Sequence, residues 1–123
     1  MLAAANRLND ASSFRDVTRR GRRAASRTVV VHVDMDPIGG APSVGFVVSR
    51  AVGNSVARNR VKRRLRHLAR ARLDLLPPGT RVVVRALPAA GSAGTAALGV
   101  DLDRSLDRAL DGPLRGARAG AAQ

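Results

Sequence analysis

The chain contains no cysteine, tryptophan, tyrosine or glutamate, and Lys62 is its only lysine. The lack of cysteine excludes disulfide scaffolds and thiolate metal sites. No apolar run approaches the roughly 18 residues that a membrane-spanning helix needs. The first residues also lack the charged and then apolar regions of a secretion signal. The sequence therefore predicts a soluble, cytoplasmic protein.

Acidic residues are few: 9 aspartates stand against 22 lysines and arginines, which gives a formal net charge of +13. Such a chain repels itself and attracts a polyanion. Nucleic acid is the first candidate partner and an anionic membrane surface the second. A G+C-rich codon usage accounts for arginine in place of lysine, but it does not account for the excess of positive charge.

Aromatic residues make up only 2% of the 123 residues, namely Phe14 and Phe46, whereas 45% of the chain is hydrophobic. This length and this hydrophobic content fit one domain with one core. The core must be built from valine, leucine and alanine. Few rings remain for stacking on nucleic-acid bases.

The first half of the chain predicts one helix and two strands. Residues 10–20 carry an apolar stripe at helical spacing, with Asn9 or Asp10 as the cap and Gly21 as a left-handed end. Residues 28–33 and 44–49 are rich in valine and read as strands. The short Pro/Gly loop between them, residues 34–42, favours an antiparallel pair.

The second half predicts a long helix from Asn54 or Ser55 to about Leu75, a strand over residues 80–87 and a helix over residues 95–110. Two positions for a further strand stay open, residues 22–27 and a short stretch after Pro88. This order predicts an α+β fold with a single sheet. We expect one domain over residues 1–111 and a flexible Gly/Ala/Arg-rich tail over residues 112–123.

The long helix carries eight cations and no acid between Arg58 and Arg72. Its apolar positions fall on one side of a helical wheel: Val61, Leu65, Leu68, Ala69 and Leu76, with Ala57 at the edge. Most of the cations fall on the other side. Arg72 lies on the apolar stripe, and we interpret it as a side chain that reaches out to solvent near the helix end.

Like charges on this helix lie four residues apart, as in Arg60–Arg64, Lys62–Arg66 and Arg66–Arg70. Each such pair destabilises the helix by a few tenths of a kcal/mol. A helix face that is only exposed to solvent usually carries both positive and negative charges. The repeated cost indicates a partner that supplies negative charge. Binding to a membrane would need the apolar side of the helix, which the strands need as a cover.

One segment of this helix, Ala57-Arg58-Asn59-Arg60-Val61-Lys62-Arg63-Arg64-Leu65-Arg66, resembles the signature of the bacterial ribonuclease P protein component. Three further blocks resemble the same family in the same order: Phe14-x-x-Val17-x-x-Arg20-Gly21-Arg22-Arg23, Val44-Gly45-Phe46-Val47-Val48-Ser49-Arg50-x-Val52-Gly53-Asn54, and Leu76-Pro77-Pro78-Gly79 with Val82-Val83-Val84-Arg85. The resemblance covers about residues 6 to 110.

The resemblance implies an αβββαβα domain of ribosomal-protein-like shape, with an unusual left-handed crossover. It also implies a protein subunit of ribonuclease P, in which the RNA subunit performs the cleavage with Mg²⁺ that the RNA and the substrate hold. The implied partners are that RNA and the single-stranded 5′ leader of precursor tRNA. Neither a membrane nor DNA is among them.

Site residues follow from the resemblance position by position. The surface that faces the catalytic RNA would comprise Ser49, Arg50, Gly53, Asn54, Arg58, Asn59, Arg60, Lys62, Arg63 and Arg66. The leader cleft would be lined by Phe14, Thr18 and His32. The family often has aromatic rings where this chain has Thr18 and His32, so leader binding here relies more on arginine and shape. Phe14 has a second interpretation, as a core residue of its helix.

The polypeptide offers little chemistry of its own. Asp34-x-Asp36 and Asp101-x-Asp103 are its only paired carboxylates, and neither resembles a two-metal site. His32 and His67 are isolated in the sequence, and we interpret His67 as part of the basic face. We expect no catalytic residue and no metal site in the protein.

The mechanism that this pattern indicates is electrostatic: the protein neutralises phosphates where leader and catalytic RNA converge. It would thereby favour precursor over mature tRNA and lower the Mg²⁺ requirement. The alternative is a ribosome-associated or general RNA-binding protein with no enzymatic partner, which would bind many RNAs alike. A DNA-binding module is disfavoured, because the sequence shows no helix-turn-helix, zinc finger or zipper heptads.

Overall fold

A mixed four-stranded sheet with the strand order β1-β2-β4-β3 forms the centre of the computed structural model, which describes residues 2–8 and 10–110. The expected α+β class and the αβββαβα order are confirmed. The elements are, in chain order, η1 (Ala4–Asn6), α1 (Ala11–Arg20), β1 (Arg22–Ala25), β2 (Val29–Met35), β3 (Ser43–Val47), η2 (Arg50–Val52), α2 (Ser55–Arg72), η3 (Leu73–Leu75), β4 (Thr80–Ala86), η4 (Pro88–Ser92) and α3 (Thr95–Ala109).

The additional strand lies at β1, one of the two positions left open, whereas the stretch after Pro88 forms the 3-10 helix η4. The expected antiparallel pairing of the strands now labelled β2 and β3 is wrong. Instead, β4 lies between them, antiparallel to β2 and parallel to β3. The reason is the valine run at Val82–Val84, which is buried on both faces of the sheet and therefore occupies a central position.

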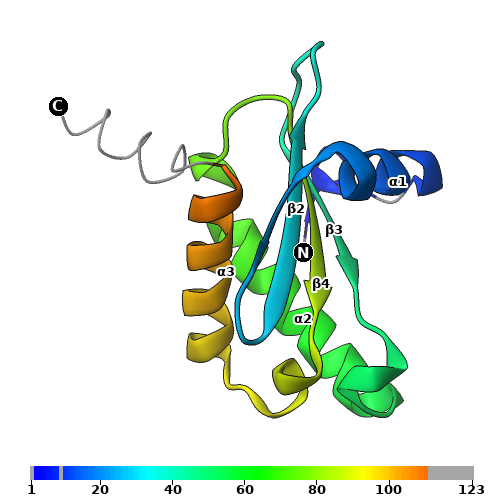
Figure 1. Cartoon of the computed structure of the whole chain (residues 1–123), viewed down its shortest axis with the longest axis vertical. Helices are drawn as coiled ribbons and strands as arrows, with labels where there is room; N and C mark the ends of the chain where they lie inside the picture. Colours follow the sequence, from blue (N-terminus) through cyan, green and yellow to red (C-terminus); the bar gives the residue numbers. More distant parts are fainter. Residues whose placement is uncertain (1, 9, 111–123) are drawn as a thin grey trace, which may run out of the picture.

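The two faces of the sheet differ in what covers them. Helices α2 and α3 pack together on one face, and α1 crosses the other face near one end (Figure 1). The main core lies on the α2/α3 side, where Val29, Val31 and Val33 of β2 meet Val82 and Val84 of β4. The rest of the α1 face carries no helix in the described part of the chain.

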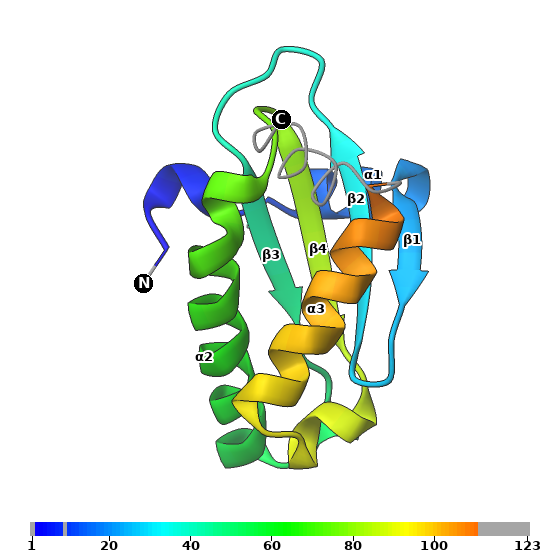
Figure 2. The same cartoon turned by 90° about the vertical axis from the view of Figure 1, so that its left-hand side faces the viewer.

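The connection β3–α2–β4 is left-handed, as the resemblance implied. Figure 2 looks onto the helix side: β3 runs down, α2 returns upward in front, and β4 runs down to the right of β3. Nearly all parallel connections have the opposite hand. This crossover places the start of α2 beside the end of β3.

Helix α1 begins as predicted, because the Asp10 carboxylate accepts a hydrogen bond from the backbone N–H of Ser13 at 3.0 Å. Its predicted left-handed end is wrong. Gly21 is extended, with φ −69° and ψ 155°. Glycine is needed there for another reason: a Cβ would overlap the backbone oxygens of Val17 and Val33, so the chain passes directly from α1 into β1.

Helix α2 is also capped as predicted, with the Asn54 side chain accepting from the Ala57 N–H at 2.9 Å. Its buried residues are those of the predicted stripe: Val61, Leu65, Leu68 and Ala69. Arg72, however, does not reach out to solvent. Its guanidinium forms a two-pronged ion pair with Asp103 of α3, at 2.5 and 3.1 Å, and joins the two helices.

Over the described ranges, 2–8 and 10–110, no helix is long and apolar enough to cross a membrane. The predicted tail, residues 112–123, falls outside these ranges.

The two sides of α2 can be separated by a pair of substitutions. Leu65 is fully buried, so Leu65→Ala should lower the free energy of unfolding by about 2–5 kcal/mol. Arg63 is exposed on the same helix, and Arg63→Ala should change the free energy of unfolding by less than about 0.5 kcal/mol. Urea denaturation measures both, and equal losses would contradict the assigned faces.

Candidate nucleic-acid interface

The polar residues of α2 divide into an outer face and two flanks. Asn59, Arg63, Arg66, His67 and Arg70 are exposed on the outer side. None of these five side chains hydrogen-bonds or pairs with another residue in the described ranges. The outer face is therefore a row of cations that are open to an external anion.

One flank of α2 faces the η4 segment. Arg60 donates to the carbonyl of Gly91 at 3.3 Å, and Arg64 donates to the carbonyl of Ala93 at 2.9 Å. Each contact occupies one of a guanidinium's five N–H groups. Arg60 is thus held in place and still has donors for a phosphate, which fits its predicted role.

The turn before α2 presents further predicted residues. Ser49 and Arg50 are exposed beside the start of α2. Gly53 has φ +153°, a conformation that favours glycine, and it turns the chain from η2 into the helix. Asn54 caps α2, and Arg58 donates to Ser55 Oγ at 3.3 Å. The ten residues predicted to face the catalytic RNA therefore lie on one continuous segment, residues 49–66.

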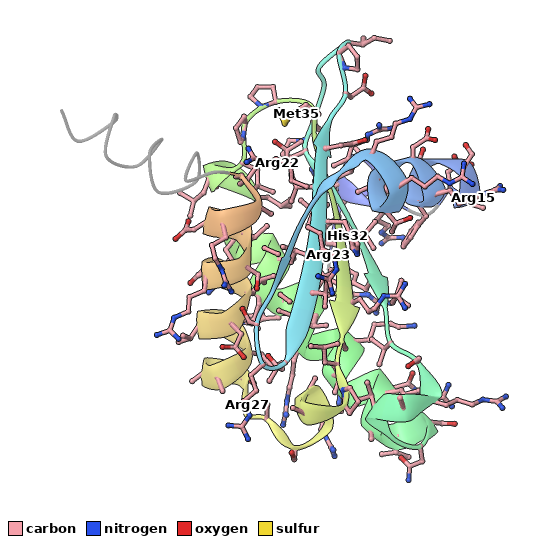
Figure 3. All side chains as sticks on the ribbon, viewed as in Figure 1. Arg15, Arg22, Arg23, Arg27, His32 and Met35 are labelled. Atoms are coloured by element: carbon pink, nitrogen blue, oxygen red, sulfur yellow. The ribbon has the colours of Figure 1, made fainter. Side chains whose placement is uncertain are left out.

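Leader-site residues lie on the other face of the sheet. One row crosses all four strands there: Arg23 pairs with His32, His32 with Val83, and Val83 with Gly45. Arg23 and His32 lie on the α1 side of the sheet (Figure 3). The structure therefore places His32 two strands, or roughly 10 Å, from Gly45.

Phe14 of α1 is half-buried over Gly45, and a Cβ at position 45 would overlap its ring. It packs with Val17, Val83 and Leu8 in a small second core. Phe14 is thus a packed, half-buried residue of this second core, and its role in a leader cleft stays a prediction.

Thr18 lies one turn after Phe14, but its hydroxyl turns back to its own helix. The Oγ1 atom lies 2.9 Å from the Phe14 carbonyl and 3.1 Å from the Arg15 carbonyl, both acceptors for its single proton. The hydroxyl can still accept a hydrogen bond, but it gives no stacking surface.

His32 lies among arginines that the sequence did not single out as site residues. Burial, and then the charges of Arg23 and Arg85, lower the pKa of His32 from its ordinary value of 6.5. Its Nδ1 atom is buried and has no hydrogen-bond partner in the described part of the chain. Arg85 could not be found from sequence, because its position beside His32 depends on the pairing of β4 with β2.

A cavity of about 500 Å³ lies between the N-terminal segment, α1, β3 and α2. It brings together residues that were predicted for two different surfaces: Phe14 from the leader site, and Lys62 and Arg66 from the catalytic-RNA site. Phe46 and Arg7 also line it.

The paired carboxylates serve the fold. Asp34 holds Arg81 with two contacts of 2.7 Å, and Asp36 accepts from the Ile38 N–H at 3.0 Å. Asp101 accepts from Thr28, and Asp103 holds Arg72. Within residues 2–8 and 10–110 no three His or Asp side chains gather as metal ligands would.

Comparison with known proteins gives one family. Residues 2–110 match the family model described as Ribonuclease P. The chain is 57% identical over 106 residues to the ribonuclease P protein component of a Nocardioides species, covering 85% of this chain and 91% of that protein. It is 53% identical over 111 residues to the same component of Streptomyces avermitilis, covering 84% and 90%.

Solved structures agree with the fold. The RNase P protein of Staphylococcus aureus is similar with a TM-score of 0.78 and 25% identity, over 85% of this chain and 95% of that one. The RNase P protein from Thermotoga maritima is similar with a TM-score of 0.72 and 23% identity, over 83% and 96%.

The pH dependence of stability tests the surroundings of His32. Because its pKa is lowered in the folded state, the unfolded chain binds the proton more tightly, so this residue lowers stability as pH falls through about 6.5 and below. We expect His32→Gln to flatten the fall in unfolding free energy between about pH 7 and pH 5. His67→Gln, a change of the exposed histidine on α2, is the matched control and should keep that fall. An unchanged profile for His32→Gln would contradict the assignment.

Proposed function

The chain belongs to the bacterial ribonuclease P protein family, and from this premise we propose that the turn before α2 and the outer face of α2 bind the catalytic RNA. The protein is the protein subunit of ribonuclease P and takes part in the 5′ maturation of tRNA. Its RNA partner is the RNA of that enzyme. The residues of the contact are Ser49, Arg50, Gly53, Asn54, Arg58, Asn59, Arg60, Lys62, Arg63 and Arg66.

The observation that carries this proposal is the outer face of α2. Its cations have no acidic partner in the described part of the chain, while the apolar side of the same helix is buried in the core. Phosphates supply the missing negative charge, and arginine's planar fork matches their geometry. A membrane surface is disfavoured, since the apolar residues that would insert into it are already covered.

The 5′ leader of precursor tRNA would lie on the α1 side of the sheet, along Phe14, Thr18 and His32. Arg23 and Arg85 support this, because they flank His32 and make no hydrogen bond or ion pair with another described residue. A single-stranded leader offers both bases and phosphates to this surface. Mature tRNA lacks the leader, so contact here favours the precursor.

Catalysis belongs to the RNA subunit in this proposal. Mg²⁺ would be held by the RNA and by the substrate, which agrees with the use of Asp34, Asp101 and Asp103 as partners of side chains within the fold. The protein neutralises phosphates where leader and catalytic RNA converge. It thereby reduces the concentration of Mg²⁺ that the RNA needs.

Processing of a precursor tRNA by a bacterial ribonuclease P RNA at low Mg²⁺ tests the assignment. We expect the protein to stimulate cleavage, and Arg63→Ala to weaken the stimulation roughly 3- to 10-fold, the loss of one phosphate contact. Arg104→Ala removes the same charge from an exposed position on α3 and is the matched control. Equal effects of the two variants would place the contact elsewhere.

Salt dependence gives an independent check on the number of contacts. If about five cations meet phosphates, the logarithm of RNA affinity should fall against the logarithm of salt concentration with a slope of about −3.5 to −4.5. Filter binding at several salt concentrations measures the slope. Arg63→Ala should make it shallower by nearly one unit, whereas Arg104→Ala should leave it unchanged. A slope near zero would contradict a phosphate-based interface.

A further inference from the structure

The 3-10 helix η4 (Pro88–Ser92) is built mostly of small residues and lies beside the start of α2 (Figure 1). It contacts α2 and also η2, the 3-10 helix of the turn before α2. Ala90 of η4 is fully buried, and together with Val52 of η2 it belongs to the main core. The segment η4 therefore supports, from the inside, a turn that the proposed function assigns to RNA.

Gly91 brings the backbone of η4 directly against η2. A Cβ at position 91 would overlap the backbone carbonyl oxygen of Val52. The φ angle of Gly91 is not in the left-handed region, so backbone conformation alone does not require glycine there. The close approach is the reason, and any other side chain at this position must push η2 and η4 apart.

Two arginines of α2 fasten η4 to that helix. The Arg60 guanidinium donates to the Gly91 carbonyl at 3.3 Å, and the Arg64 guanidinium donates to the Ala93 carbonyl at 2.9 Å. Arg64 is half-buried, whereas its neighbour Arg63 is exposed. The segment η4 is thus tied to α2 and packed against η2, so it connects the helix with the turn that precedes it.

The turn before α2, residues 49–54, has few hydrogen bonds of its own. The Val52 N–H donates to the Ser49 carbonyl, and the Gly53 N–H donates to the Arg50 carbonyl, each at 3.1 Å. A single 3-10 turn is a weak element by itself, because its hydrogen-bond geometry is poor. A loop that is ordered before it binds loses less conformational entropy on binding. The RNA affinity of this turn therefore depends on what supports it.

We propose that η4 positions the contact with the catalytic RNA: Gly91 lets η4 pack against Val52, and this packing holds residues 49–54 in the conformation that RNA binds. Gly91 is thus a positioning residue, which acts through the turn without touching the RNA. Arg60 and Arg64 keep η4 in place on α2. The proposal rests on the proposed function, which assigns this turn to the catalytic RNA.

Gly91→Ala tests this role in the full-length protein with a bacterial ribonuclease P RNA. We expect the affinity for that RNA to fall roughly 3- to 10-fold, as for the loss of one hydrogen bond. Gly94→Ala is the matched control, because a Cβ at position 94 would meet no heavy atom of the described chain within 4 Å, apart from its own neighbours. Gly94 caps α3, where alanine is unfavourable, so the control lowers stability without displacing η2. Its RNA affinity should change by less than about twofold.

Coupling between substitutions distinguishes positioning from a general loss of stability. Arg50 belongs to the turn, whereas Arg63 lies on the outer face of α2. In the Gly91→Ala protein, Arg50→Ala should weaken RNA binding less than it does in the unaltered protein, since the displaced turn has already lost that contact. Arg63→Ala should have the same effect in both backgrounds. Additive effects of Gly91→Ala and Arg50→Ala overturn the proposal.

Hydrogen exchange measures the order of the turn directly. The amides of Val52 and Gly53 should be protected from exchange in the unaltered protein without RNA. Gly91→Ala should remove this protection, while the amides of β4 keep theirs. The proposal is wrong if the two amides of the unaltered protein become protected only when RNA binds, and this result does not require any variant to fold.

Arg63→Ala separates failure of this proposal from failure of the proposed function. If Arg63→Ala weakens RNA binding and Gly91→Ala does not, only the role of η4 is removed. Equal losses of affinity for Gly91→Ala and Gly94→Ala also remove it, because lower stability alone would explain them. If Arg63→Ala and Arg50→Ala both bind RNA as the unaltered protein does, the RNA contact itself is wrong, and the role of η4 with it.

Discussion

Burial of one side of α2 against the sheet is the constraint on which the remaining structure depends. Val61, Leu65, Leu68 and Ala69 must leave water, and the valines of β2 and β4 need a cover. Once this face is fixed, the helix can turn most of its cations only outward or to its flanks. The same packing that stabilises the domain thus displays the charged surface. Fold and function are coupled through the orientation of a single helix.

The few acids of the chain explain why that surface remains unneutralised. Asp34 holds Arg81 across β2 and β4, Asp103 holds Arg72 between α2 and α3, and Asp101 binds Thr28. Each ties two elements together instead of facing the exposed arginines. These three carboxylates are thus used in contacts within the fold, and the cations on the outer face of α2 are left for a polyanion.

The sheet separates two kinds of surface. Its α2/α3 face is closed and forms the main core, whereas its other face is covered by α1 only near one end (Figures 1 and 2). On this second face a histidine lies between two arginines from neighbouring strands. The cavity at the edge of β3 connects this face with the flank of α2. It is lined by Phe14 of the proposed leader contact and by Lys62 and Arg66 of the proposed catalytic-RNA contact.

The sequence by itself determined the elements and their faces, because these follow from short-range patterns. Helical periodicity identified the buried stripe of α2, capping residues located the starts of α1 and α2, and valine runs marked three of the four strands. The excess of arginine and the four blocks of resemblance identified the kind of partner. Charge patterns and local periodicity can be recognised from the sequence because they involve residues within a few positions of one another.

Only the tertiary structure decided which distant residues meet. The insertion of β4 between β2 and β3 overturned the expected antiparallel pair of β2 and β3, and it alone brings Arg85 close to His32. The partner of Arg72 lies 31 positions away in the sequence, and that of Thr28 lies 73 away. The cavity likewise combines residues from the N-terminal segment, α1, β3 and α2. Such contacts depend on how strands and helices share one core, and the energy of that packing has no local signature in the sequence.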